Sequence, residues 1–184
     1  MDSAENQILF YKLLRRIFMK KEKMNDKGFS LVELIIVIAI MAVLVVVLAP
    51  QYLKYVEKSR NSTDASNATS IVTALQVWAA DPDAGESFKA DGTTKTTPFA
   101  KGDKFEIKVE STSGSFVDAG NVGTGNKAAE DALDEAAITL GTTKCKSKNN
   151  WTYYIIKGEV QANGSIAFTY ESDNSNAFAA AMTK

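Results

Sequence analysis

The feature that most constrains this chain is a run of 21 residues, Phe29 to Ala49, in which only Ser30 and Glu33 are not apolar. About 20 apolar residues in a helix are enough to span the hydrocarbon core of a bilayer. The run is therefore predicted to be a helix that lies in a membrane for at least part of the life of the chain. Glu33 is unexpected there, because a charged side chain costs about 3 kcal/mol near the centre of a membrane helix, and less near its end, and implies a partner.

The residues before the run are basic. Residues 1–28 contain seven Lys or Arg against four Asp or Glu, whereas residues 29–184 contain fourteen against eighteen. Four of these lysines lie close to the run, namely Lys20, Lys21, Lys23 and Lys27. By the positive-inside rule, this asymmetry keeps the N-terminus in the cytoplasm and sends the C-terminal body outward.

Two ordinary explanations of the run fit less well. A secretory signal peptide has an apolar core of about 7 to 15 residues, which is shorter than this one. The small-residue cleavage site that Ala49 would complete is followed by Pro50, which generally obstructs such a cut. A plain single-pass anchor leaves Glu33 without an explanation.

The residues at the start of the run closely resemble the N-terminal motif of type IV pilins and pseudopilins. The stretch KGFSLVEL, Lys27 to Leu34, combines a glycine, a phenylalanine directly after it and a glutamate at the fifth position of the run, and Pro50 lies near the end of the run. The resemblance is strong over residues 24–55 and extends to the rest only as architecture. A leader of 28 residues is longer than many in this family; a start at Met24 would leave five residues, and both starts stay open.

The resemblance implies a route for the chain. A prepilin peptidase would cut on the cytoplasmic side after Gly28 and methylate the new amine of Phe29, and Glu33 and Pro50 would act in assembly. An assembly platform with its ATPase would then move the subunit from the membrane into a filament of identical copies. The family is structural, so the resemblance implies no catalytic residue, cofactor or metal.

A charge pair would give Glu33 a physical role. Cleavage after Gly28 would place a positive amine at the start of an apolar helix, where the helix dipole disfavours it. The Glu33 carboxylate of a neighbouring subunit could neutralise that amine, and the carboxylate of the same subunit, one turn away, could do so in part before assembly. An unpaired buried charge costs about 3–5 kcal/mol, so this pair would fix the register of the subunits.

The sequence pattern divides the chain into a leader (1–28), an apolar transmembrane or filament-core helix (29–50), an amphipathic continuation of that helix (51–80) and a globular β-rich domain (81–184). Residues 51–80 contain no Gly or Pro. Small or apolar residues recur there with a helical period: Ala68, Ile71, Val72, Leu75, Trp78 and Ala79. One helix is predicted from Phe29 to Ala80, with its apolar half projecting from the domain. The stretch from Glu57 to Asn67 is polar nearly all round, and is predicted to be solvated or to face other subunits.

Four strands and a short helix are predicted after residue 104. The strands are 105–110, which alternates strictly, 115–118, 151–156 and 165–171; Asn163-Gly164 is a hairpin turn signal between the last two. A helix is predicted at residues 126–140 with Gly141 as its cap. The fold class is therefore α+β, a long N-terminal helix packed by its C-terminal half on a small antiparallel sheet.

The composition excludes several kinds of active site. The chain has no histidine, so His-dependent zinc sites, Ser-His-Asp triads and Cys-His dyads cannot be built from it. Cys145 is the only cysteine, which rules out an intramolecular disulfide, and it is predicted to be a small, half-buried side chain. There is no basic stripe for nucleic acid and no phosphate-binding loop of the GxxxxGK[ST] kind. An enzyme is therefore not predicted.

Three clusters of side chains have ordinary explanations. Asp81, Asp83 and Glu86 offer oxygen ligands of the kind that Ca²⁺ prefers, but their spacing matches no EF-hand loop, so a solvated turn is predicted. The acidic residues are predicted to form one exposed helix face; they are Glu130, Asp131, Asp134 and Glu135. The aromatic residues are predicted to pack within the sheet; they are Trp151, Tyr153, Tyr154 and Tyr170.

The sequence therefore predicts a structural subunit, in the first instance the major pilin of a type IV pilus. It would begin as a single-pass membrane precursor and end in an extracellular filament. A pseudopilin of a type II secretion system, or a subunit of a competence pilus, is the nearest alternative because it shares the motif. A membrane-tethered extracellular binding domain is the alternative from a different class. The sequence does not choose between adhesion, twitching and DNA uptake.

Overall fold

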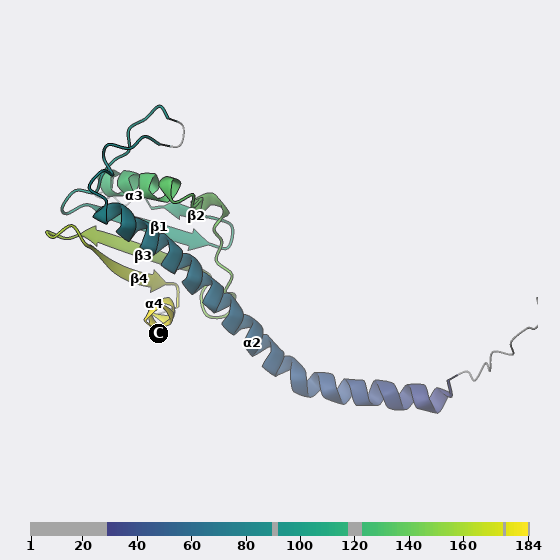
Figure 1. The fold of residues 1–184 in the computed structure, drawn as a ribbon. Helices are drawn as coiled ribbons and strands as arrows, with labels where there is room; N and C mark the ends of the chain where they lie inside the picture. Colours follow the sequence, from purple (N-terminus) through teal and green to yellow (C-terminus); the bar gives the residue numbers. More distant parts are fainter. Residues whose placement is uncertain (1–28, 90–91, 118–122, 175, 184) are drawn as a thin grey trace, which may run out of the picture. The chain divides into compact units, whose positions relative to one another are not determined.

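The computed structural model describes residues 29–89, 92–117, 123–174 and 176–183 (Figure 1). The chain divides into two units, residues 1–48 and residues 49–184, and we call the second unit the head. The leader predicted at residues 1–28, with the cleavage residue Gly28, lies outside the described residues.

Helix α2, Leu31–Ala80, is 50 residues long. It confirms the predicted long helix and begins two residues later than expected, because Ser30 occupies the capping position. It ends where Asp81 enters a turn in which its N–H donates to the carbonyl oxygen of Trp78 at 3.2 Å.

Within the head, one face of α2 is buried. Ala68, Ile71, Leu75 and Trp78 are each at most 4% exposed, and their spacing of three or four residues places them on one side of the helix. The Trp78 indole N–H also donates to the carbonyl oxygen of Thr97 at 3.4 Å. The C-terminal half of the helix therefore packs by one face, as the helical period predicted.

Four antiparallel strands form one sheet in the order β2-β1-β3-β4. Their bounds are β1 Lys104–Glu110, β2 Gly114–Phe116, β3 Tyr153–Val160 and β4 Ile166–Ser172. Asn163 and Gly164 lie in the β3–β4 turn, with Gly164 at φ +82°, a conformation that suits glycine. The predicted small antiparallel sheet is thus confirmed.

Strand β3 is longer than the predicted segment because it continues through Gly158. Gly158 pairs with Phe105 of β1 on one side and with Phe168 of β4 on the other. The Phe105 ring lies against Gly158 and occupies the space where a side chain would project. Glycine in the interior of a strand often marks a position that another group approaches closely. Here that group is the Phe105 ring.

The core lies between the sheet and the helices (Figure 1). Helix α3, Gly123–Glu135, and the short helix α4, Ala177–Met182, complete it. Helix α4 was not predicted; its Phe178 is fully buried and contacts three of the aromatic residues expected to pack with the sheet: Trp151, Tyr154 and Tyr170. The fourth, Tyr153, lies under the ammonium of Lys108 at 4.3 Å.

Helix α3 ends earlier than predicted, and Gly141 is not its cap. The N–H of Ile138 donates to the carbonyl oxygen of Leu133 at 2.8 Å, and the N–H of Ala137 donates to that of Asp134 at 3.0 Å. This pattern is a Schellman motif, with Ala137 in the left-handed region at φ 55°. Gly141 instead lies in the 3-10 helix η1, Leu140–Thr142.

Ala137→Gly is therefore expected to stabilise the head by about 1 kcal/mol, because glycine adopts a positive φ without the steric cost that alanine has there. Urea unfolding of the full chain measures the change. Ala136→Gly, one residue earlier and without a positive φ, is the matched control and should not stabilise. Equal effects of the two substitutions would contradict the assignment of Ala137 to the cap.

Candidate assembly site

Ser30 and Glu33 form a capping box at the start of α2. The N–H of Ser30 donates to Glu33 Oε2 at 2.8 Å, and the N–H of Val32 donates to Ser30 Oγ at 3.3 Å. Such reciprocal bonds satisfy N–H groups that have no partner within the helix. The bond from the N–H of Ser30 holds the Glu33 carboxylate near Phe29, the residue before Ser30. Cleavage after Gly28 would create the new amine at Phe29.

The segment that follows is apolar and fully open. Every residue from Phe29 to Leu48 is exposed, and Phe29 is 86% exposed. In the part of the chain that the structure describes, one helix, α2, is long and apolar enough to cross a membrane. Soluble proteins rarely leave so large an apolar surface in water, so this helix is consistent with a membrane-anchored precursor.

Pro50 lies inside α2. A proline has no N–H to donate to the carbonyl group four residues before it, so the helix lacks one hydrogen bond at this point. Nothing in the described contacts of Pro50 assigns it an assembly role, and that role stays a prediction from the motif.

The stretch predicted to be solvated or to face other subunits, Glu57 to Asn67, contains two carboxylates that are buried within the head, and for these two residues the prediction was wrong. Glu57 is 6% exposed and Asp64 is 0% exposed. They lie seven residues apart, two turns along one side of α2. Both accept hydrogen bonds from residues 145–151, which we call the clamp loop.

Asp64 is the more deeply buried of the two carboxylates that accept hydrogen bonds from the clamp loop. Its Oδ1 accepts from the N–H of Lys146 at 2.7 Å, and its Oδ2 accepts from the N–H of Ser147 and the indole N–H of Trp151, both at 2.9 Å. The Cys145 thiol also lies 3.4 Å from Oδ2. These hydrogen bonds connect residues that are more than 80 positions apart in the chain.

Glu57 is the less deeply buried of the two carboxylates. Its Oε1 accepts from the Ser147 hydroxyl and from the N–H groups of Lys148 and Asn149, each at 2.8 Å, while Oε2 lies 3.4 Å from Arg60. Burial alone would raise the pKa of Glu57, but the hydrogen bonds from the clamp loop outweigh burial and lower this pKa to about 2.

The two carboxylates hold the clamp loop against α2 without a covalent link. Cys145 is buried, and burial followed by the nearby negative charge of Asp64 raises its thiol pKa to about 12. A thiol in this state is a weak nucleophile. Cys145 therefore serves as a buried side chain of the clamp loop, more completely buried than predicted.

Asp64→Ala is expected to destabilise the head by about 3–5 kcal/mol, because it leaves three N–H donors unpaired in a buried site. Chemical unfolding followed by tryptophan fluorescence measures the loss, since Trp151 is one of the donors. Asp134→Ala, at an exposed aspartate, is the matched control and should change stability by less than about 0.5 kcal/mol. A loss at Asp64 as small as at Asp134 would contradict the clamp.

Glu57 is expected to make the stability of the head depend on pH in the acidic range. Its folded-state pKa of about 2 lies below the ordinary value of 4.5, so its contribution is complete above pH 4.5 and is lost as the pH falls towards 2. The difference in melting temperature between the wild type and Glu57→Gln should therefore shrink over this range. Glu130→Gln, at an exposed carboxylate, should show a small difference at every pH; a Glu57→Gln difference that did not change with pH would contradict this account.

The other acidic clusters behave differently from one another. Asp131 was predicted to lie on an exposed face but is 1% exposed; it accepts from the N–H of Thr97 at 2.5 Å and pairs with Lys89 at 2.7 Å. At the suggested calcium cluster, Asp81 accepts from the N–H of Asp83 within a turn. Over the described ranges, no group of three or more Cys, Asp or Glu side chains is arranged to hold a metal ion.

Comparison with known proteins finds one family model, the prokaryotic N-terminal methylation motif, over residues 23–49. This motif is the signature of type IV pilin and pseudopilin precursors, and confirms the resemblance drawn from the sequence. It implies processing by a prepilin peptidase. No curated protein and no solved structure matches the chain.

Proposed function

We propose that this chain is the precursor of the major subunit of a type IV pilus. It is inserted in the cell membrane with its N-terminus in the cytoplasm, cut after Gly28 and methylated at Phe29. It then assembles with identical copies into a surface filament. The observation that carries the proposal is the methylation motif at residues 23–49, which ends within a fully exposed apolar helix.

Glu33 supplies the contact that sets the register of the subunits. Its carboxylate already accepts the N–H of Ser30, so the helix start is built to hold a negative charge near the mature N-terminus. In a filament, the amine of an adjoining copy reaches this charge, and each amine is neutralised where water is excluded. A pair of this kind fixes geometry more than it adds stability.

Assembly requires work from outside the chain. Transfer of the apolar helix from lipid to a filament core gains little from the hydrophobic effect, because acyl chains are already apolar, and packing must provide the rest. An assembly platform with an ATPase is therefore a required partner in this proposal. The chain itself has no phosphate-binding loop of the GxxxxGK[ST] kind.

Shearing of intact cells tests the proposal against its alternatives. If the chain is a major pilin, most of its mature form is expected in the sheared surface fraction. It should form filaments that are visible by electron microscopy and labelled by an antibody to the head. Recovery of the chain only in the membrane fraction, with no filaments, would favour the tethered binding domain. Short filaments confined to the cell envelope would favour the pseudopilin.

A further inference from the structure

Three exposed lysines of the head lie near the C-terminal end of the apolar segment of α2. Lys54 and Lys58 on α2 and Lys148 on the clamp loop are exposed, and we call these three the basic collar. Lys144 and Lys146, also exposed, continue the charge along the chain. Over the described ranges, none of the five lies within ion-pair distance of a carboxylate, whereas the paired lysines lie in the sheet and the loop before it: Lys89, Lys95, Lys104, Lys108 and Lys157.

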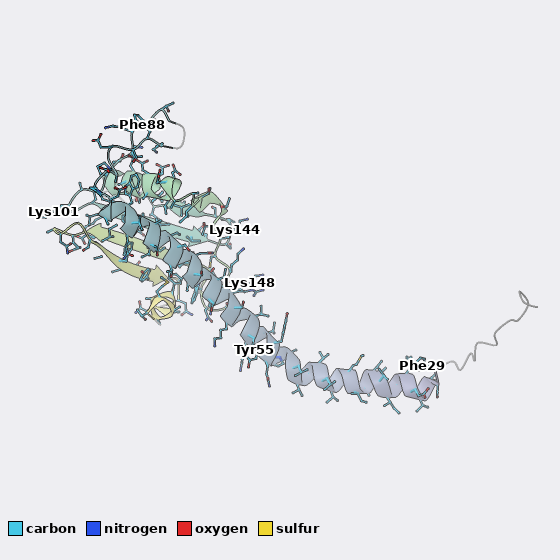
Figure 2. The ribbon with its side chains drawn as sticks, in the orientation of Figure 1. Phe29, Tyr55, Phe88, Lys101, Lys144 and Lys148 are labelled. Atoms are coloured by element: carbon cyan, nitrogen blue, oxygen red, sulfur yellow. The ribbon has the colours of Figure 1, made fainter. Side chains whose placement is uncertain are left out.

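The clamp brings the collar together. The N–H of Lys148 donates to Glu57 Oε1 at 2.8 Å, which places Lys148 beside the helical turn that carries Lys58. The two carboxylates on this part of α2 do not neutralise the collar at its surface, because Glu57 and Asp64 are buried and occupied by donors of the clamp loop. Figure 2 shows Lys148 alongside α2, and Lys101 at the far end of the head.

The collar begins at the height of the lipid headgroups. Lys54 follows Ala49 by five residues, about 8 Å along a helix, which is the outer edge of a headgroup layer about 5–8 Å thick. Lys58 follows Ala49 by nine residues, about 14 Å along a helix, and so lies just outside this layer but within a screening length of about 8–10 Å of it. Tyr52 lies between the apolar run and Lys54, and Tyr55 lies between Lys54 and Lys58; their side chains are 67% and 71% exposed. Exposed tyrosines followed by lysines are typical of the interface between hydrocarbon and water.

We propose that the basic collar binds the anionic headgroups of phospholipids on the outer face of the membrane while the subunit waits as an anchored precursor. The lysine ammonium groups donate to phosphate oxygens, and the attraction holds the head against the membrane until the subunit is extracted. The inference rests on the membrane-anchored stage of the proposed function. Each lysine near an anionic surface strengthens such binding about fivefold.

Lysine labelling of the full chain in lipid nanodiscs tests the collar. Discs of phosphatidylcholine alone are compared with discs that contain phosphatidylglycerol, and acetylation by a water-soluble ester is followed at each lysine by mass spectrometry. In the anionic discs, acetylation of Lys54, Lys58 and Lys148 is expected to be about fivefold slower, with Lys101 unchanged. The protection should disappear at about 1 M salt, where the screening length is about 3 Å.

A charge-matched pair of variants isolates the collar. K58E/K148E should abolish the protection of Lys54, whereas K95E/K101E, with the same change in net charge at exposed positions, should preserve it. Equal labelling of the collar in both kinds of disc, with the chain still inserted, would overturn the collar alone. Failure of the chain to enter discs would overturn the anchored stage and the collar with it.

Two further arms exclude other occupants. Protection in neutral discs by millimolar inorganic phosphate would show a free-anion site and overturn the lipid assignment. Protection in neutral discs that rises with the number of chains per disc would show that the collar meets a second copy, and would also overturn it. Protection that requires phosphatidylglycerol and is the same at one chain per disc supports the proposal.

Discussion

Glu33→Ala is expected to lower filament yield by about 100-fold or more while leaving cleavage after Gly28 intact. The loss of the carboxylate leaves the amine of the adjoining copy buried and unpaired, which costs about 3–5 kcal/mol, and each 1.4 kcal/mol is a factor of ten in an association constant. The measurement is the mass of sheared filaments per cell, with the length of the mature chain determined on the same samples.

Glu33→Gln separates the two roles that the structure allows for this side chain. In the structure, Glu33 accepts the N–H of Ser30 in a capping box, and a glutamine at this position keeps that bond but removes the charge. If the charge pair directs assembly, the Gln variant should fail like the Ala variant. Normal filament yield from Glu33→Gln would show that Glu33 acts only as a helix cap.

Gly28→Val is expected to abolish processing. A peptidase must bring its catalytic groups close to the backbone at the scissile bond, and a branched side chain beside that bond obstructs the approach that glycine permits. The full precursor should accumulate in the membrane fraction, and filaments should be absent. Gel mobility and intact mass of the membrane-bound chain provide the measurement.

Ser30→Val is the matched control for Gly28→Val, since it places the same side chain two residues further along, after the predicted cut. It removes the capping hydroxyl of α2, a change of about 1 kcal/mol, and should leave cleavage in place. Mature-length chain from Gly28→Val would contradict the assignment of the cleavage site.

Much of the fold could be predicted because its signals are local. The helical period from Ala68 to Trp78, the alternation in β1 and the Asn163-Gly164 turn each require only neighbouring residues, and all three are present in the structure. The predicted ends of helices and strands were less accurate where contact with a residue distant in the sequence determines them. Strand β3 continues through Gly158 because the Phe105 ring of another strand covers it.

The clamp could not be predicted because its donors, most of which are backbone N–H groups, lie more than 80 residues away from the carboxylates. One signal was available. Glu57 and Asp64 continue the spacing of the buried stripe that begins at Ala68, so two acids stood on the face that packs. A charged residue on a buried helix face usually has a fixed partner, and this argues against a stretch that is solvated all round.

The most direct test of the account is the mass of the N-terminal peptide of the chain recovered from sheared native filaments. The account predicts a peptide that begins at Phe29 and carries one methyl group on its amine, with no trace of residues 1–28. A filament chain that retained residues before Phe29, or began at Phe29 with an unmodified amine, would contradict it.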